Sequence, residues 1–187
     1  MSTFFESITD DQQAFIERQH IFFVSTAPTQ GRINLSPKGL DSFRILTPNR
    51  VAYVDLTGSG NETSAHLRDN GRITLMFCAF DGEPQILRLF GRGTVVNQAS
   101  PDWDDLACQF PPYAGTRQIM VIEVEQSQKS CGMGIPLYTH QNDRKSLTDY
   151  WQKRDPQALR SFWQTRNTAS IDGLAPYPLD ESSDDSF

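Results

Sequence analysis

A glycine-rich turn between two apolar segments is the part of the sequence whose residue types best fit ligand chemistry. Residues 51–56 read Val-Ala-Tyr-Val-Asp-Leu, which is typical of a strand, and Thr57-Gly58-Ser59-Gly60 interrupts them. Ser59 and Glu62 have the spacing of a capping box, which predicts a helix from Asn61 to Asp69. Such a turn directs backbone N–H groups and the positive end of the helix to one point, and this arrangement favours a phosphate.

The alternative for this turn is purely structural. Ser59 and Glu62 would then cap each other and leave no vacancy for an anion, and Glu62 also brings negative charge to the place where a phosphate would lie. The turn is not a P-loop, because no Gly-Lys-Ser/Thr follows it. It is not the Rossmann fingerprint either, because Gly-x-Gly-x-x-Gly is absent from it.

Cationic side chains elsewhere in the chain have two interpretations. Lys38 follows a proline and precedes a glycine after a strand, and Arg88 and Arg92 share one face of a strand whose other face is apolar. Each is either a solvated surface charge or part of a cationic lining for an anionic ligand. The second interpretation requires that Lys38, the turn 58–63 and Arg88 meet at one place.

Familiar catalytic patterns are absent from the sequence. The histidines at positions 20, 66 and 140 show no metal-ligand spacing with the cysteines, and no Gly-x-Ser-x-Gly elbow is present. Cys131 lies in a glycine-bearing loop, and we interpret it as a structural or contact residue because no histidine is identified that would activate it. The sequence therefore identifies no catalytic residue and no metal site, which favours a protein whose cofactor supplies the chemistry.

Composition narrows the class of protein. The chain has 187 residues, a net charge of −6 and a pI of about 5.0, so nucleic-acid binding is disfavoured. It opens with no signal peptide, and no apolar run approaches the ~20 residues of a membrane span. We expect a cytoplasmic protein with reduced thiols that contacts neither membrane nor nucleic acid.

The predicted elements are mostly short strands joined by tight turns. The strands are expected at 21–26, 32–36, 43–46, 51–56, 72–80, 85–96 and 117–124. Helices are expected after Thr9, which forms a capping-box pattern with Gln12, at 61–69, at 102–108, around 147–151, and after Asp155, which is a cap followed by a proline. This order predicts a mainly β fold, a small antiparallel Greek-key barrel with helices packed outside. We expect a barrel domain over residues 1–140, a helical extension over 141–178 and an acidic disordered tail over 179–187.

Several motifs in this order resemble a known family. They are Phe22-Phe23-Val24-Ser25-Thr26, the run from Gly31 to Gly39, the turn and helix from Gly58 to Leu67, the run from Asn70 to Phe77, and Arg88-Leu89-Phe90-Gly91-Arg92-Gly93. Together they resemble the pyridoxamine 5′-phosphate oxidase-like family of FMN-binding split barrels, over roughly the first two-thirds of the chain. Ser130-Cys131-Gly132 and the run from Asn167 to Leu174 are similar to a branch of predicted flavoproteins in that group.

This resemblance implies a fold, a cofactor and an assembly. The fold is a split β-barrel, the cofactor is FMN, and the protein is a homodimer with the flavin at the subunit interface. The implied activity is that of an FMN-dependent oxidoreductase acting on a small-molecule substrate. The first alternative is a non-catalytic split-barrel module that binds flavin or haem for storage or sensing. The second is a structural barrel without a cofactor, in which the glycine turn only caps the helix.

The resemblance also places residues at the cofactor. The strand 33–38 would run along the flavin, the turn 57–63 would hold the ribityl phosphate, and Arg88 would lie on the strand that passes the isoalloxazine. The vitamin B6 oxidases carry Ser-Arg-Lys at the helix start where this chain has Asn61-Glu62-Thr63, so two cations are missing. The residues expected at the cofactor are Asn34, Ser36, Lys38, Thr57, Gly58, Ser59, Gly60, Asn61, Thr63, Arg88, Arg117, Cys131 and Gly132.

Overall fold

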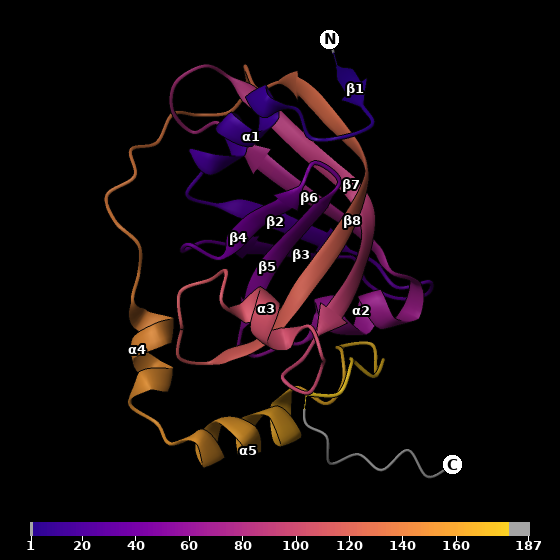
Figure 1. The fold of residues 1–187 in the computed structure, drawn as a ribbon, viewed down its shortest axis with the longest axis vertical. Coiled ribbons are helices and arrows are strands. Elements are labelled where there is room, and N and C mark those ends of the chain that lie inside the picture. Colours follow the sequence, from indigo (N-terminus) through magenta and orange to yellow (C-terminus); the bar gives the residue numbers. More distant parts are fainter. Residues whose placement is uncertain (1, 180–187) are drawn as a thin grey trace.

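The structure is a computed structural model that describes residues 2–179 (Figure 1). Its elements are β1 (Thr3–Phe5), α1 (Asp10–Glu17), β2 (Phe22–Thr26), β3 (Asn34–Lys38), β4 (Phe43–Thr47), β5 (Arg50–Leu56), α2 (Glu62–Asn70), β6 (Arg72–Cys78), β7 (Gln85–Val96), α3 (Trp103–Ala107), β8 (Thr116–Cys131), α4 (Ser146–Gln152) and α5 (Pro156–Arg166). From residue 180 on, the predicted acidic tail lies outside the described residues.

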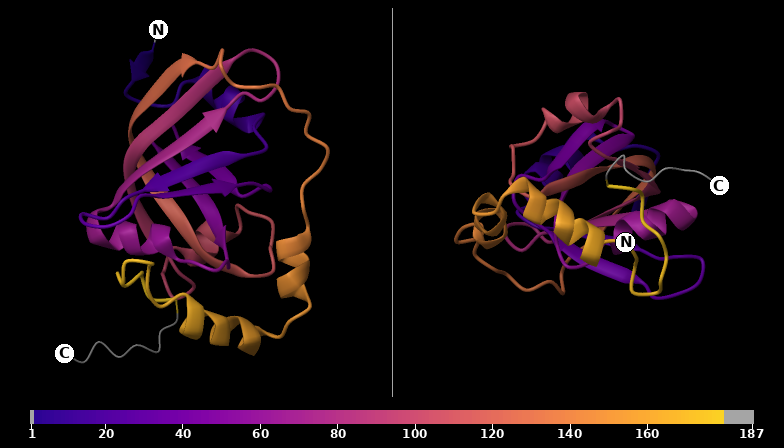
Figure 2. Two further views of the ribbon diagram at one scale, coloured as in Figure 1. Left: turned by 180° about the vertical axis from the view of Figure 1, so that it is seen from behind. Right: turned by 90° about the horizontal axis from the view of Figure 1, so that it is seen from below.

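The strands form one antiparallel sheet that curls into a barrel (Figure 2). Their order is β3-β2-β6-β7-β8-β5-β4, and β1 adds to β8. In this order β3 and β4 are the edge strands, so the hydrogen-bond ladder is open between them. The prediction of a mainly β split barrel with helices outside is confirmed.

A bulge bends the two longest strands. The register of β7 against β8 shifts between Phe90 and Gly91. A Cβ atom at Gly91 would lie 2.1 Å from the carbonyl oxygen of Glu123, so only glycine lets the two backbones approach this closely. The bulge lets β7 and β8 wrap around the core. In this core Phe22 packs edge-on against Tyr53 and stacks on Phe77.

Local capping signals are correct for two helices and wrong for a third. Thr9 and Gln12 form a reciprocal capping box at α1, and the Asp155 side chain accepts a hydrogen bond from the Ala158 N–H at α5. At α2 the N-cap is Asn61, which makes no side-chain capping bond, so the predicted box between Ser59 and Glu62 is absent. The reason is a competing partner for Glu62, described below.

β8 is longer than the sequence pattern indicates. It runs on to Cys131 because residues 127–131 pair with β1 or β7, so Ser130 and Cys131 belong to a strand and not to a loop. β3 likewise includes Pro37, which an edge strand tolerates because its outer N–H positions need no partner.

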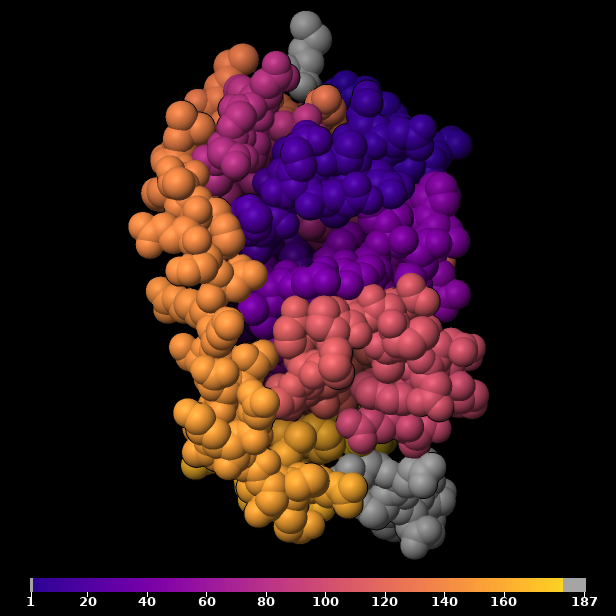
Figure 3. Space-filling view, turned by 60° about the vertical axis from the view of Figure 1, so that its left-hand side comes forward, coloured from indigo at the N-terminus to yellow at the C-terminus, as the bar shows by residue number. Residues whose placement is uncertain are grey.

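The chain after β8 crosses the barrel and covers one of its ends. Residues 132–145 contain no helix or strand and run along one side of the molecule (Figure 3). α4 and α5 then reach the end of the barrel where α2 and α3 lie (Figure 1). None of the helices within residues 2–179 is long and apolar enough to cross a bilayer.

Candidate phosphate and cofactor site

A cavity of about 370 Å³ lies where the glycine turn meets the edge strand β3. Its lining comes from β3, the end of β5, the turn, the start of α2 and the start of β8. The predicted residues that line it are Asn34, Ser36, Lys38, Gly58, Ser59, Gly60, Asn61, Thr63 and Arg117. The folded chain therefore gathers most of the predicted cofactor residues at one place, which we call the cradle.

The cradle offers uncharged hydrogen-bond donors. The N–H groups in the first turn of a helix have no partner inside the helix, and no side chain caps α2. The Asn34 side chain reaches across from β3 and donates to Thr63 Oγ1 at 3.2 Å. Nothing lies within 4 Å of the place where a Cβ atom of Gly58 would be, so the turn faces open space. These donors and this space fit the oxygens of a phosphate.

A buried carboxylate balances the two cations of the cradle. Asp55 is 2% exposed and accepts from Lys38 Nζ at 2.9 Å, Arg117 Nη2 at 2.6 Å and Gln118 Nε2 at 2.9 Å. Burial raises the pKa of Asp55, but the charges of Arg117 and Lys38 and the hydrogen bonds from Gln118 and Lys38 outweigh burial and hold the pKa well below its usual range. Asp55 is thus ionised, and the three charges form one network.

Arg117 contributes mainly by fixing the turn. Its Nη1 donates to the carbonyl oxygen of Gly60 and to Asn167 Oδ1, both at 2.9 Å, while Nε and Nη2 donate to Asp55. Its guanidinium is therefore largely occupied by protein acceptors. Its positive charge still lies at the wall of the cradle.

Four predicted residues lie away from the cradle lining. Thr57 is buried beneath the turn, where its hydroxyl donates to the Gly115 carbonyl oxygen at 2.9 Å. Arg88, Cys131 and Gly132 lie together where β7 begins and β8 ends, and Arg88 Nη1 donates to Ser130 Oγ at 3.3 Å. Within this chain the structure does not bring Arg88 to the cradle.

Glu62 is held by the C-terminal segment. Its two carboxylate oxygens lie 3.0 and 3.2 Å from the backbone N of Ile171, which replaces the expected bond near Ser59. Between these segments a second hollow of about 540 Å³ continues from the cradle, with Arg32 and Asn34 on one side and Ser170 on the other. The outer wall of the site is therefore built by residues about 109 positions away in the sequence.

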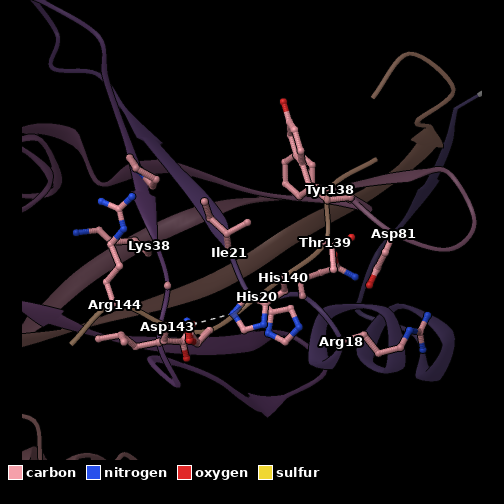
Figure 4. Close-up of a pocket in the computed structure, with 16 residues that line it drawn as sticks. Arg18, His20, Ile21, Lys38, Asp81, Tyr138, Thr139, His140, Asp143 and Arg144 are labelled. Carbon is pink, nitrogen blue, oxygen red and sulfur yellow. Dashed lines mark hydrogen bonds and ion pairs between the residues drawn. The ribbon is translucent and has the colours of Figure 1, made fainter. Parts of the chain in front are cut away.

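A third cavity, of about 540 Å³, lies on the other side of Lys38 (Figure 4). Pro37 and Lys38 line both this cavity and the cradle. Its floor carries His20 and His140, whose rings stack with centroids 3.8 Å apart. We call it the histidine cavity.

Charged and aromatic groups lie at the two ends of the histidine cavity. Figure 4 shows Arg144 beside Lys38 at one end and Tyr138 with Asp81 toward the other. Residues between Tyr138 and Arg144 form one wall of the cavity, and the Tyr138 N–H donates to the Phe80 carbonyl oxygen at 2.8 Å to hold this wall in place.

Comparison with known proteins identifies the family of this chain. A family profile described as pyridoxamine 5′-phosphate oxidase matches residues 8–131. The chain belongs to this family. A pyridoxamine 5′-phosphate oxidase family protein, ustO of Aspergillus flavus, is 46% identical over 152 residues, and the match covers 73% of this chain and 57% of that protein. The chain thus spans a little over half the length of this relative.

Solved structures agree with the fold of this pyridoxamine 5′-phosphate oxidase family member. A single-residue variant of HupZ from Group A Streptococcus superposes with a TM-score of 0.51 at 19% identity, over 66% of this chain and 99% of that one. A general stress protein 26-related protein of the pyridoxinephosphate oxidase family from Clostridium acetobutylicum gives 0.51 at 14% identity, over 65% and 86%.

Sequence reasoning missed several residues that build the cradle. Asp55, Gln118 and Asn167 were not expected, yet they hold Lys38, Arg117 and the turn. The sequence does indicate that Asp55 is unusual, because it is the one charged residue in the apolar run 51–56. An ionisable group in such a run needs a buried partner.

Proposed function

We propose that the protein is a flavoprotein that binds FMN and acts as an FMN-dependent oxidoreductase on a small molecule. The observation that carries the proposal is the cradle itself, where an uncapped helix start, an open glycine turn and the polar side chains of β3 converge. Membership of the pyridoxamine 5′-phosphate oxidase family supports the same cofactor.

FMN fits the cradle better than FAD. The cradle presents one uncapped helix start, that of α2, to receive a phosphate, and the turn 57–63 would hold it. Lys38 and the polar side chains Asn34 and Ser36 follow along β3, where they would contact the ribityl chain and the ring. When bound, the flavin supplies the electron transfer, and the protein supplies its position and the polarity around it.

The histidine cavity is our proposed place for the substrate. It adjoins the proposed flavin position through Lys38 and Pro37, and its size lies within the usual range of small-ligand pockets, about 300–1,000 Å³. Substrate bound there and flavin bound along β3 would meet at Lys38.

We also propose that the protein is a homodimer with the flavin at the interface. Ile33, directly before β3, and Leu35, on the outer side of β3, are 75% and 63% exposed, next to the half-buried Asn34 and Ser36. An exposed apolar strip on an edge strand favours a second copy as its cover. A contact through β8 has less support, because residues 117–124 are all buried within the chain except Glu123.

The decisive experiment is titration of the purified protein with FMN, FAD and riboflavin, followed by flavin fluorescence, and then addition of NAD(P)H. Tight binding of FMN in preference to FAD is expected, and flavin reduction with turnover would identify an oxidoreductase. Absence of binding by all three flavins would overturn the proposed function, whereas binding without turnover would leave a flavin-binding module.

A further inference from the structure

We propose that the segment from Trp151 to Ile171 is a clamp that turns the N–H groups of the glycine turn toward the bound phosphate, with Asn167 as its central positioning residue. The proposal rests on the proposed function in one respect, that the cradle holds the phosphate of FMN. It explains how a cradle whose two cations are already paired with Asp55 would hold an anion.

Asn167 sits beneath the turn and contacts both of its sides. It is 2% exposed, its Nδ2 donates to the Gly58 carbonyl oxygen at 3.2 Å, and its Oδ1 accepts from Arg117 at 2.9 Å. Its own carbonyl oxygen accepts from Asn61 Nδ2 at 3.5 Å. One side chain thus links the first glycine of the turn to the arginine that holds the second.

Two buried tryptophans hold the residue that precedes the turn. Trp151 Nε1 donates to the Thr57 carbonyl oxygen at 2.9 Å, and Trp163 Nε1 donates to Thr57 Oγ1 at 2.8 Å. Both tryptophans are 5% exposed or less, so these bonds lie away from water. A buried, satisfied hydrogen bond fixes orientation, because leaving either partner unpaired would be costly.

The direction of these bonds determines where the backbone N–H groups of the turn point. The carbonyl oxygens of Thr57, Gly58 and Gly60 all accept from donors beneath the turn, namely Trp151, Asn167 and Arg117. In a trans peptide the C=O and the following N–H point in opposite directions across a planar unit. The N–H groups of Gly58, Ser59 and Asn61 therefore point away from the clamp and toward the cradle.

This geometry has an electrostatic consequence for an anion. Three carbonyl dipoles that would repel a phosphate are turned away, and three N–H dipoles that attract it are turned toward it. Successive N–H groups directed at one point form an anion-binding nest, and they add to the positive end of α2. The clamp would thus add oriented backbone dipoles to a cradle whose two cations are paired with Asp55.

The test compares the binding of FMN with that of riboflavin, which differs from FMN only in lacking the phosphate. Asn167→Ala removes the donor to Gly58, and Trp151→Phe removes the donor to Thr57 while keeping an aromatic ring. Each variant is expected to weaken FMN binding about three- to tenfold, the effect of one lost hydrogen bond, and to leave riboflavin binding within about twofold. Trp103→Phe is the matched control, because Trp103 packs in a separate core cluster.

A second measurement makes the clamp testable without flavin. Hydrogen exchange of residues 57–63 is expected to be faster in Asn167→Ala than in the unmodified protein, while exchange of β7 and β8 stays the same. Equal weakening of FMN and riboflavin, or unchanged exchange of the turn, would overturn the clamp. If the unmodified protein binds no flavin, the proposed function fails and the exchange experiment still decides the clamp.

Discussion

Lys38 Nζ lies 2.9 Å from Asp55 Oδ1, and this ion pair joins the edge strand β3 to β5 across the opening of the barrel. Backbone hydrogen bonds do not join the two edges of the sheet there, and the Lys38–Asp55 side-chain pair makes the connection instead. Asp55 also pairs with Arg117 at 2.6 Å, and the carboxylate is therefore the common partner of two cations from two different strands.

Asp55→Asn is expected to destabilise the fold strongly. The change leaves the buried Arg117 without its counter-charge, and breaking a buried pair costs about 3–5 kcal/mol. Urea unfolding measures the loss. Glu123→Gln is the control, because the Arg50–Glu123 pair is exposed and removing it should cost under ~1 kcal/mol. Equal losses for both variants would contradict the role given to Asp55.

Stability should fall in acid in a way that depends on Asp55. The folded-state pKa of Asp55 lies below its unfolded value of about 3.9. Its contribution is therefore complete above that pH and is lost as the pH falls toward the folded-state pKa, with a slope of up to ~1.4 kcal/mol per pH unit. Urea midpoints between pH 5 and 2.5 should fall less steeply in Asp55→Asn, and parallel curves would refute the assignment.

Gly58→Ala should impair the cradle and not the fold. The added Cβ meets nothing within 4 Å, so the free energy of unfolding should change by only about 0.5 kcal/mol. Because the new methyl group would project into the space proposed for the phosphate, FMN affinity is expected to fall about tenfold or more. Gly134→Ala, which also meets nothing within 4 Å, is the control and should leave FMN affinity unchanged.

Glu62→Gln is expected to keep or tighten FMN binding. The amide oxygen of glutamine can still accept from the Ile171 N–H, while the negative charge beside the cradle disappears. A gain of about two- to tenfold at low salt, shrinking at high salt, follows from the removed repulsion. Thr63→Val should weaken FMN binding by removing a hydroxyl from the cradle. The reverse pattern, measured by fluorescence titration, would mean that the phosphate lies elsewhere.

Leu35→Glu should shift the protein from dimer to monomer. Leu35 is exposed on the edge strand, so the change leaves the folded monomer intact but places a charge in the proposed contact. Sedimentation at micromolar concentration measures the shift, and a concurrent loss of FMN affinity is expected if the flavin lies between subunits. A monomeric unmodified protein that still binds FMN would rule out the dimer.

The sequence predicted the features that depend on neighbouring residues. The capping box of Thr9 and Gln12, the alternation along β7 and the glycine turn all depend on local spacing, and the structure has them. The Ser59–Glu62 box was wrong because Ile171, far along the chain, takes the carboxylate.

Partners brought together by folding could not be predicted in the same way. Asp55 and Arg117 are 62 positions apart, and Asn167 and Gly58 are 109 apart. No pattern of one chain indicates which buried polar groups will meet over such separations. The location of the cradle was therefore predictable, and the network that shapes it was not.

The bond between Thr57 and Trp163 also sets an order of events while the protein is made. The 106 positions between these residues take roughly 5–20 s to synthesise at about 5–20 residues per second. Late in this interval the nascent chain contains every barrel strand, yet its turn lacks the indole and amide partners that arrive with α4, α5 and Asn167. With the proposed clamp, tight FMN binding would wait until translation has passed residue 167. Incomplete chains that end before this residue would therefore bind FMN more weakly than the full chain.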